Sequence, residues 1–242
     1  MLTVIRPRVD DNLVEIGPGR GALTKALLPQ LHKLNAIEID HDLIPTLQQI
    51  APTKLQIYEE DVLKFDFKAL GAKLRVVGNL PYNISTPIFF HLLKFFPQLC
   101  DLHFMVQKEV AERITATPGN KNFGRLSVIL QYYFQTDLLF LVPKEAFNPP
   151  PQVTSAVIRL IPRPPNERTL TATEEQNLAQ IVRVLFSTRR KMLRSHKWLN
   201  PNLLSKLGID PCARPEDLTV TQFVTLSRWH RWHGWHGHLI QG

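Results

Sequence analysis

Short apolar segments alternate with helix-length segments from about residue 12 to residue 106, and this alternation limits what the chain can fold into. Four strand candidates lie in this region, at Asn12–Ile16, Ala36–Asp40, Leu55–Tyr58 and Leu74–Gly78. Strands separated by helices are typical of a parallel sheet with crossover helices. With 242 residues, 44% of them hydrophobic, the chain is long enough for one such sheet and a small second domain.

The turn after the first strand candidate is rich in glycine. It reads Gly17-Pro18-Gly19-Arg20-Gly21, and a helical pattern follows it directly. Such a glycine loop lets a ligand approach the backbone and presents free N–H groups at the start of the helix. Its spacing differs from the dinucleotide fingerprint G-x-G-x-x-G, and because no Lys-Ser/Thr pair follows, it is not a P-loop. By itself this glycine loop is a weak signal.

Acidic residues follow the strand candidates in order. Glu15 lies two residues before the glycine loop, Glu38 ends the second strand candidate, and Asp61 and Val62 follow the third. An acid about 20 residues past such a loop binds ribose hydroxyls in related sheets. Asp61 is placed to accept a hydrogen bond from an adenine amino group. Single acids at strand ends are more often solvated loop residues, but together these fit a nucleoside-like ligand.

The tetrapeptide Asn79-Leu80-Pro81-Tyr82 comes directly after the fourth strand candidate. The exocyclic amino group of adenine is a poor nucleophile because its lone pair is delocalised into the ring. The side-chain oxygen of Asn79 and the backbone carbonyl of Leu80 can each accept one N–H and so localise that pair. Pro81 restricts the backbone, and Tyr82 offers a flat face on which an extruded base can stack. The same residues also suit an ordinary turn.

In this order, the glycine loop, the acids and the tetrapeptide resemble the motif series of S-adenosylmethionine-dependent methyltransferases that act on N6 of adenine. More specifically, the chain resembles the small-subunit ribosomal RNA adenine dimethyltransferase family over roughly residues 10 to 225. The likeness includes the segments 79–86, 106–114, 124–128, 147–157 and 189–194. The resemblance implies a Rossmann-like α/β methyltransferase sheet with crossover helices and a small all-helical C-terminal domain.

The resemblance also implies that S-adenosylmethionine is the co-substrate. The glycine loop would hold its methionine part, Glu38 its ribose and Asp61 its adenine, with Val62 beside the ring. The implied donor-binding set is Glu15, Gly17, Gly19, Gly21, Glu38, Asp61, Val62 and Asn79. We expect no metal, because direct transfer of a methyl group to nitrogen needs none.

At the acceptor, the resemblance implies that Asn79 and Leu80 hold the target amino group. Tyr82 would stack on one face of the adenine, and Phe147 is a candidate for the other, although a core or hinge aromatic is an equally good interpretation of Phe147. The implied catalytic set is Asn79, Leu80, Pro81, Tyr82 and Phe147. The implied product carries two methyl groups on each of two adjacent adenosines near the 3′ end of small-subunit (16S) ribosomal RNA.

Positive charge is concentrated in the last third of the chain. The net charge is +8, and residues 163–242 hold 12 basic and 6 acidic side chains. Arginine suits phosphate contacts, so beside the methyltransferase motifs this charge favours RNA binding over an ordinary solvated face. We expect Thr171 and Glu174 to cap the helix that carries the densest cluster, with Arg190 and Arg194 on one face. The implied RNA-binding set is Arg189, Arg190, Lys191 and Arg194.

These patterns predict four parts. Residues 1–161 form the catalytic domain, residues 162–166 a stiff Pro-rich linker, residues 167–228 a small helical domain that binds RNA or the ribosome, and residues 229–242 a tail. The tail holds three Trp-His pairs, at Trp229, Trp232 and Trp235, which would suit metal binding or base stacking. Its glycines favour a flexible, low-complexity tail instead.

The composition indicates the cellular compartment in which the protein works. Cys100 and Cys212 are too few for a disulfide framework, and we expect them to be buried apolar fillers in a reducing compartment. No apolar run approaches the ~20 residues that span a bilayer, and the chain does not begin with a signal-peptide pattern. These features predict a monomeric cytoplasmic protein without membrane contact, whose partner is the small ribosomal subunit.

Only eleven residues precede Asn12. Members of the family usually carry a basic segment with a Phe- and Gln-containing motif, and a helix, before the first strand. The resemblance therefore predicts that this chain binds S-adenosylmethionine more weakly than an N-terminally extended version does.

Three alternatives stay open on the sequence alone. A large-subunit ribosomal RNA adenine dimethyltransferase of the antibiotic-resistance type shares the donor motifs, but the segments 124–128 and 147–157 look closer to the small-subunit family. DNA adenine methyltransferases usually follow the first residue of the tetrapeptide with Pro-Pro. A non-catalytic assembly or transcription factor on the same fold is the third, and the intact Asn79 and Tyr82 argue against it.

Overall fold

The computed structural model describes residues 1–147 and 150–230, so most of the Trp-His tail lies outside the described residues. Its helices are α1 (Leu2–Ile5), α2 (Ala22–Leu27), α3 (Ile44–Ile50), α4 (Ser85–Leu93), α5 (Lys108–Ile114), α6 (Arg125–Tyr133), α7 (Ala172–Ser187), α8 (Pro201–Lys206) and α9 (Val220–His230). Its strands are β1 (Asn12–Ile16), β2 (Leu34–Glu38), β3 (Leu55–Glu59), β4 (Leu74–Asn79), β5 (Leu99–Gln107), β6 (Phe134–Val142) and β7 (Ser155–Pro162). Within the described ranges, no helix is both long enough and apolar enough to cross a membrane.

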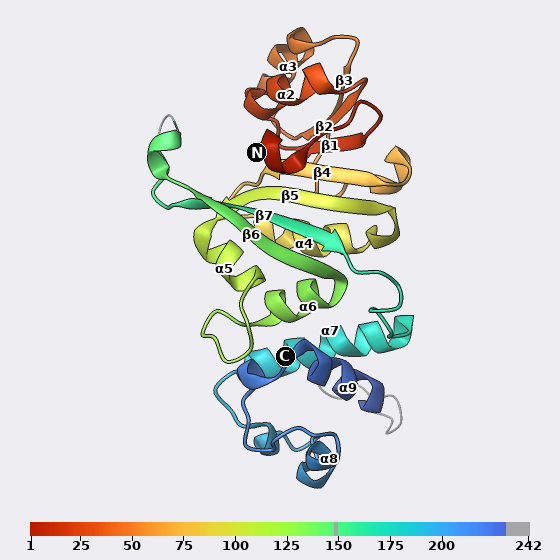
Figure 1. Ribbon diagram of the computed structural model, residues 1–242, viewed down its shortest axis with the longest axis vertical. Helices are drawn as coiled ribbons and strands as arrows, with labels where there is room; N and C mark the ends of the chain where they lie inside the picture. The colour runs from red at the N-terminus through yellow and green to blue at the C-terminus, as the bar shows by residue number, and fades with distance from the viewer. Residues whose placement is uncertain (148–149, 231–242) are drawn as a thin grey trace. The chain divides into compact units, whose positions relative to one another are not determined.

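The strands form one seven-stranded sheet in the order β3-β2-β1-β4-β5-β7-β6 (Figure 1). Strands β1 to β5 pair in parallel, and β7 pairs antiparallel with β5. The predicted parallel sheet with crossover helices is confirmed for the first five strands. The chain winds away from β1 in both directions, first to β2 and later to β4. Ligands bind at such a switch point, beyond the carboxyl ends of the strands.

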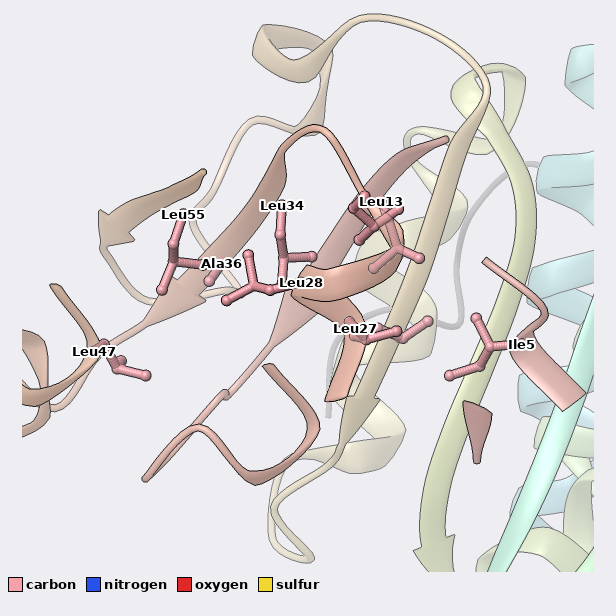
Figure 2. Packing of buried hydrophobic residues seen from close by; sticks show 10 residues of the cluster. Ile5, Leu13, Leu27, Leu28, Leu34, Ala36, Leu47 and Leu55 are labelled. Atoms are coloured by element: carbon pink, nitrogen blue, oxygen red, sulfur yellow. The ribbon is translucent and has the colours of Figure 1, made fainter. Parts of the chain in front are cut away.

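Alternation along the strands separates two faces of the sheet. On one face, Leu13 of β1 and Leu34 of β2 belong to a buried cluster that Ile5, Leu27 and Leu47 of the first three helices complete (Figure 2). On the other face, the Phe104 ring of β5 meets the Phe89 ring of α4 edge-on, with ring centroids 5.6 Å apart. Apolar burial on both faces is what a parallel sheet with crossover helices requires.

Gly78 sets how closely β1 and β4 approach each other. It pairs with Ile16, and a Cβ added at Gly78 would lie 2.4 Å from the Ile16 carbonyl oxygen. Real Cβ atoms do not come this close to backbone. Glycine is therefore required here by space, not by backbone conformation.

The other end of β4 is held by Arg75. Its guanidinium bonds the Asp101 carboxylate at 3.0 and 3.1 Å and forms an ion pair with Asp11. It also donates to the carbonyl oxygens of Ile5 and Arg6, at the end of α1. One largely buried side chain thus ties the first helix to the amino ends of two central strands, at the edge of the sheet opposite the switch point.

The chain forms two compact units. The sheet unit comprises residues 1–111 and 135–162, and the helical unit comprises residues 112–134 and 163–242. The sequence analysis assigns residues 112–134 to the first domain, whereas here they belong with the C-terminal helices. The functional division into domains stays a prediction.

The helical unit is built around α6, α7 and α9. Thr171 and Glu174 form the predicted capping box at the start of α7. The Phe186 ring of α7 stacks on Phe223 of α9, with ring centroids 5.9 Å apart. The predicted small helical C-terminal part is therefore present, with α6 added to it from earlier in the chain.

The prediction that both cysteines are buried is wrong. Cys100 and Cys212 are exposed, not buried. Cys100 lies where the β4–β5 register shifts by one residue, which leaves it outside the regular inward alternation. Cys212 lies in a turn of the helical unit, where its N–H donates to Asp210.

Candidate active site

The glycine loop connects β1 to α2. Gly17, Gly19 and Gly21 have φ values of 65°, 58° and 79°, in the left-handed region that favours glycine. A Cβ added at Gly21 would also lie 2.3 Å from Cδ1 of Ile50, whereas the space around Gly19 is open. The loop therefore keeps its shape by packing at one end and presents bare backbone at its centre.

Glu15 lies buried beneath this loop, with 2% of its surface exposed. Its Oε2 accepts a hydrogen bond of 2.7 Å from the hydroxyl of Thr24 on α2. Burial raises the pKa of Glu15 to about 7, and the nearby charge of Glu38 adds to this while the Thr24 hydrogen bond opposes it. The carboxyl consequently keeps its proton to a higher pH than an ordinary glutamate does. The sequence analysis missed Thr24.

Glu38, the last residue of β2, ties the glycine loop to the next strand. Its Oε2 accepts from the Gly19 N–H at 3.0 Å, and its Oε1 accepts from the N–H groups of Ile39 and Asp40, each at 3.0 Å. Three backbone donors hold this carboxylate in place. Glu38 is buried, with 7% of its surface exposed, and that it binds a ribose stays a prediction.

Asp61 and Val62 follow β3 at the same edge of the sheet. The Glu60 N–H donates to the Glu38 carbonyl at 3.0 Å, which keeps this segment beside the end of β2. The Asp61 Oδ1 accepts from the Leu63 N–H at 2.9 Å, and the Val62 side chain is buried. The predicted series of acids therefore lies along one edge, at the ends of β1, β2 and β3.

The tetrapeptide Asn79–Tyr82 begins at the last residue of β4. Asn79 is exposed, whereas Leu80 is buried and donates its N–H to the Met105 carbonyl of β5 at 3.0 Å. A Cβ added at Gly17 would lie 4.0 Å from the Asn79 carbonyl oxygen. The structure thus brings the tetrapeptide into contact range of the glycine loop, at the switch point between β1 and β4.

The two aromatic residues of the predicted catalytic set differ in their surroundings. Tyr82 is 39% exposed, and its hydroxyl lies 3.3 Å from the hydroxyl of Ser155 on β7. Phe147 is half-buried and ends a short turn, where its N–H donates to the Lys144 carbonyl at 3.1 Å. That Phe147 covers the second face of the base stays a prediction. The sequence analysis did not single out Ser155.

The predicted RNA-binding residues lie in the helical unit, beyond the end of α7. Helix α7 ends at Ser187, Arg189 to Lys191 follow in a turn, and Arg194 lies on the short 3-10 helix Leu193–Ser195, so the prediction that Arg190 and Arg194 share a helix face is wrong. The Arg189 guanidinium forms an ion pair with Glu216. The exposed members of the cluster are Arg190, Lys191 and Arg194.

Two solved methyltransferases share this architecture. A dimethyladenosine transferase from Plasmodium falciparum aligns with a TM-score of 0.82 and 26% sequence identity over 95% of this chain and 94% of that one. The 23S rRNA methyltransferase ErmE aligns with a TM-score of 0.73, and at 24% identity this likeness speaks for the fold alone. The chain has a Rossmann-like methyltransferase fold.

Sequence comparison identifies the family to which the chain belongs within this class of methyltransferases. The family model described as "Ribosomal RNA adenine dimethylase" matches residues 2–231, and the chain belongs to this family. The ribosomal RNA small subunit methyltransferase A of Dechloromonas aromatica is 48% identical over 95% of this chain and 90% of its own length. The protein of the same name from Acinetobacter baylyi is 51% identical over 92% of this chain and 83% of its own length. The resemblance stated from the sequence is confirmed.

Proposed function

We propose that this protein transfers methyl groups from S-adenosylmethionine to N6 of two adjacent adenosines near the 3′ end of 16S ribosomal RNA. The product is N6,N6-dimethyladenosine, formed during ribosome biogenesis. The observation that carries the proposal is the approach of Gly17 to the Asn79 carbonyl oxygen, because the proposed donor loop and the proposed amino-group site are then neighbours. The relatives from Dechloromonas aromatica and Acinetobacter baylyi, both named as small-subunit methyltransferases, support the small subunit as substrate. The protein acts as a cytoplasmic monomer in this proposal.

The residues around the glycine loop fit the proposed co-substrate. Bare backbone at Gly19 has open space for a ligand, and Glu38 offers carboxylate oxygens for ribose hydroxyls. Asp61 and Val62 supply an acceptor and an apolar surface for the adenine ring. When bound, S-adenosylmethionine supplies a methyl group on a positively charged sulfur that is a good leaving group. The protein's task is therefore to position the acceptor nitrogen.

Asn79 and Leu80 prepare that nitrogen in this mechanism. The Asn79 side-chain oxygen and the Leu80 carbonyl accept the two N–H bonds of the adenine amino group, and the lone pair is thereby localised toward the methyl group. As the N–C bond forms, the S–C bond breaks, and the nitrogen then releases one proton to water. Tyr82, exposed beside this site, stacks on the base and fixes its plane.

The helical unit supplies the proposed RNA contacts. Arg190, Lys191 and Arg194 are exposed and bind phosphates, since guanidinium and ammonium groups neutralise the RNA backbone without reading its sequence. Arg189 is partly committed to Glu216, so its share of RNA binding is the smallest of the four.

One assay tests the proposal. Labelled S-adenosylmethionine is incubated with small subunits, large subunits or duplex DNA, each from a source that lacks the corresponding methylation. We expect label in small-subunit RNA only, and its loss with Asn79→Ala. Asn166→Ala, which removes an exposed asparagine outside the site, is the matched control and should transfer label normally. Label in large subunits or DNA, or unchanged transfer by Asn79→Ala, would contradict the proposal.

A further inference from the structure

Tyr82 is an exposed residue whose hydroxyl contacts a buried one. It is 39% exposed, and its hydroxyl lies 3.3 Å from the Ser155 hydroxyl, where either oxygen can be the donor. Ser155 itself is buried, with 1% of its surface exposed. A buried hydroxyl needs a hydrogen-bond partner inside the protein, and Tyr82 supplies one for Ser155. The contact thereby ties the end of the exposed Tyr82 side chain to a buried residue.

Strand direction explains how Ser155 reaches this place. It is the first residue of β7 and pairs with Gln107, the last residue of β5. Because β7 is antiparallel to β5, its amino end lies at the edge where β4 and β5 end. The Lys108 N–H donates to the Thr154 carbonyl at 2.9 Å and extends this pairing by one step. Ser155 is thus fixed by sheet hydrogen bonds, not by a mobile loop.

The main chain of the tetrapeptide is fixed independently. The Leu80 N–H bonds Met105 of β5, and the hydroxyl of Ser85, at the start of α4, donates to the Tyr82 carbonyl at 3.4 Å. A tyrosine side chain has only two rotatable bonds before its ring. With the backbone held by β5 and α4, and the hydroxyl held by β7, the first side-chain torsion of Tyr82 is set, and with it the position of the ring.

We propose that Ser155 is a positioning residue for methyl transfer. Its hydroxyl fixes the position of the Tyr82 ring, and with it the position of the stacked adenine, so that the amino lone pair points at the methyl donor. The proposal rests on the proposed function, because it assigns the tether to that reaction. Loss of the tether lowers the rate of transfer more than it lowers affinity, since alignment matters at the moment of bond formation.

The second methyl transfer depends on the tether more than the first. An unmodified amino group offers two N–H bonds, one to Asn79 and one to Leu80. After one transfer a single N–H remains, so one of these two hydrogen bonds is gone. The stacking position set by Tyr82 then carries a larger share of the alignment. Without the Ser155 hydroxyl, the monomethylated product accumulates.

The test is a double-mutant cycle of Ser155→Ala and Tyr82→Phe, which remove the two hydroxyls and keep the ring. Values of kcat and KM are measured with unmethylated small subunits, and nucleosides are separated to give the ratio of monomethyl to dimethyl product. We expect each single variant to lower kcat about three- to tenfold, the range of one neutral hydrogen bond, with KM nearly unchanged. The double variant should be no slower than the slower single variant, and all three should accumulate monomethyladenosine.

The matched control is Ser227→Ala, which removes another buried serine hydroxyl, one that donates to Val224 within α9 of the helical unit. Its kcat and product ratio should equal those of the unaltered protein. Thermal unfolding of every variant shows whether folding is kept, and if Ser155→Ala fails to fold, Tyr82→Phe alone must still show the slower second transfer.

Additive losses in the double variant, a normal product ratio, or an effect on KM alone would overturn the proposal. No transfer to small subunits by the unaltered protein would instead contradict the proposed function itself.

Discussion

The two halves of the site are built differently, although both end at the same edge of the sheet. The donor half, with Glu15, Gly19 and Glu38, is largely buried, and its carboxylates accept hydrogen bonds of 2.7 to 3.0 Å from Thr24 and from backbone N–H groups. The acceptor half, Asn79 to Tyr82, exposes three of its four side chains. It is held by the hydrogen bond from the Leu80 N–H to Met105 and by the contact between the Tyr82 and Ser155 hydroxyls.

The difference follows from the size of the two ligands. A small co-substrate can be surrounded, so its site can be fixed in advance by buried charge and hydrogen bonds. An RNA strand must enter from solvent, so the residues that meet it stay exposed and are positioned through their backbone or the far end of a side chain. Rigidity is thus obtained by burial in one half and by tethering in the other.

The largest expected effect comes from the residue that joins the halves. Gly78→Ala places a Cβ against the Ile16 carbonyl, where backbone on both sides must move. We expect a loss of about 4 kcal/mol in the free energy of unfolding, at the upper end for overpacking, measured by urea denaturation. Gly124→Ala is the matched control, because its φ of −163° is extended and the space around it is open. Equal stability of the two variants would show that the halves are not held together at Gly78.

Because Glu15 of the donor half is buried, the stability of the folded protein should depend on pH. Glu15 titrates near 4.5 in the unfolded chain and at about 7 in the folded one, so between these values the folded state binds the extra proton and stability falls as pH rises. Glu15→Gln stays neutral and keeps an acceptor for Thr24. We expect it to match the unaltered protein near pH 4 and to be more stable by about 3 kcal/mol above pH 7. Parallel stability curves between pH 4 and pH 8 would refute the buried, high-pKa carboxyl.

Removing the Glu38 carboxylate should weaken co-substrate binding and leave RNA binding unchanged. Glu38→Ala leaves the Gly19 N–H without its acceptor and removes the proposed ribose contact. We expect about 30-fold weaker binding of S-adenosylmethionine in calorimetric titration, with affinity for small subunits unchanged. Asp66→Ala, which removes a solvent-facing carboxylate that caps a short turn, serves as the control. A comparable loss of small-subunit affinity would mean that the halves are not separable.

A change in the acceptor half should slow methyl transfer and leave co-substrate binding unchanged. Tyr82→Ala removes the stacking face, and we expect about tenfold slower transfer to small subunits with unchanged binding of S-adenosylmethionine, as for loss of one base-stacking contact. Single-turnover transfer and calorimetric titration separate the two quantities. Weaker binding of the co-substrate would place Tyr82 in the donor half instead.

Sequence reasoning predicts where Glu15, the glycine loop and Glu38 lie because the signals for these positions are local, while their roles in donor binding stay predictions. A glycine turn after a strand, and acids that end successive strands, meet at one edge whenever the strands are parallel. Asn79 was found for the same reason, as the end of β4. The basic cluster was misplaced because Arg189 to Arg194 looks helical by spacing, while the buried face of α7 stops at Leu185.

The residues that were missed depend on long-range register. Ser155 reaches Tyr82 only because β7 turns back against β5, and Arg75 reaches Asp101 only because the β4–β5 register shifts by one residue. No spacing in the sequence reports either event. Thr24 is closer to its partner, but a threonine in the first turn of a helix has no signal that points to a buried acid.

The reversed direction of β7 also decides which loops can change without disturbing the sheet. At the parallel strands, the segments that follow the strand lie at the reactive edge, whereas at β7 it is the segment before the strand that lies there. Inserting or exchanging residues between positions 150 and 154 would therefore reshape the surroundings of the proposed acceptor site, and we expect that new acceptor preferences can be selected there. An insertion after Pro162, at the opposite end of the same strand, would leave those surroundings as they are.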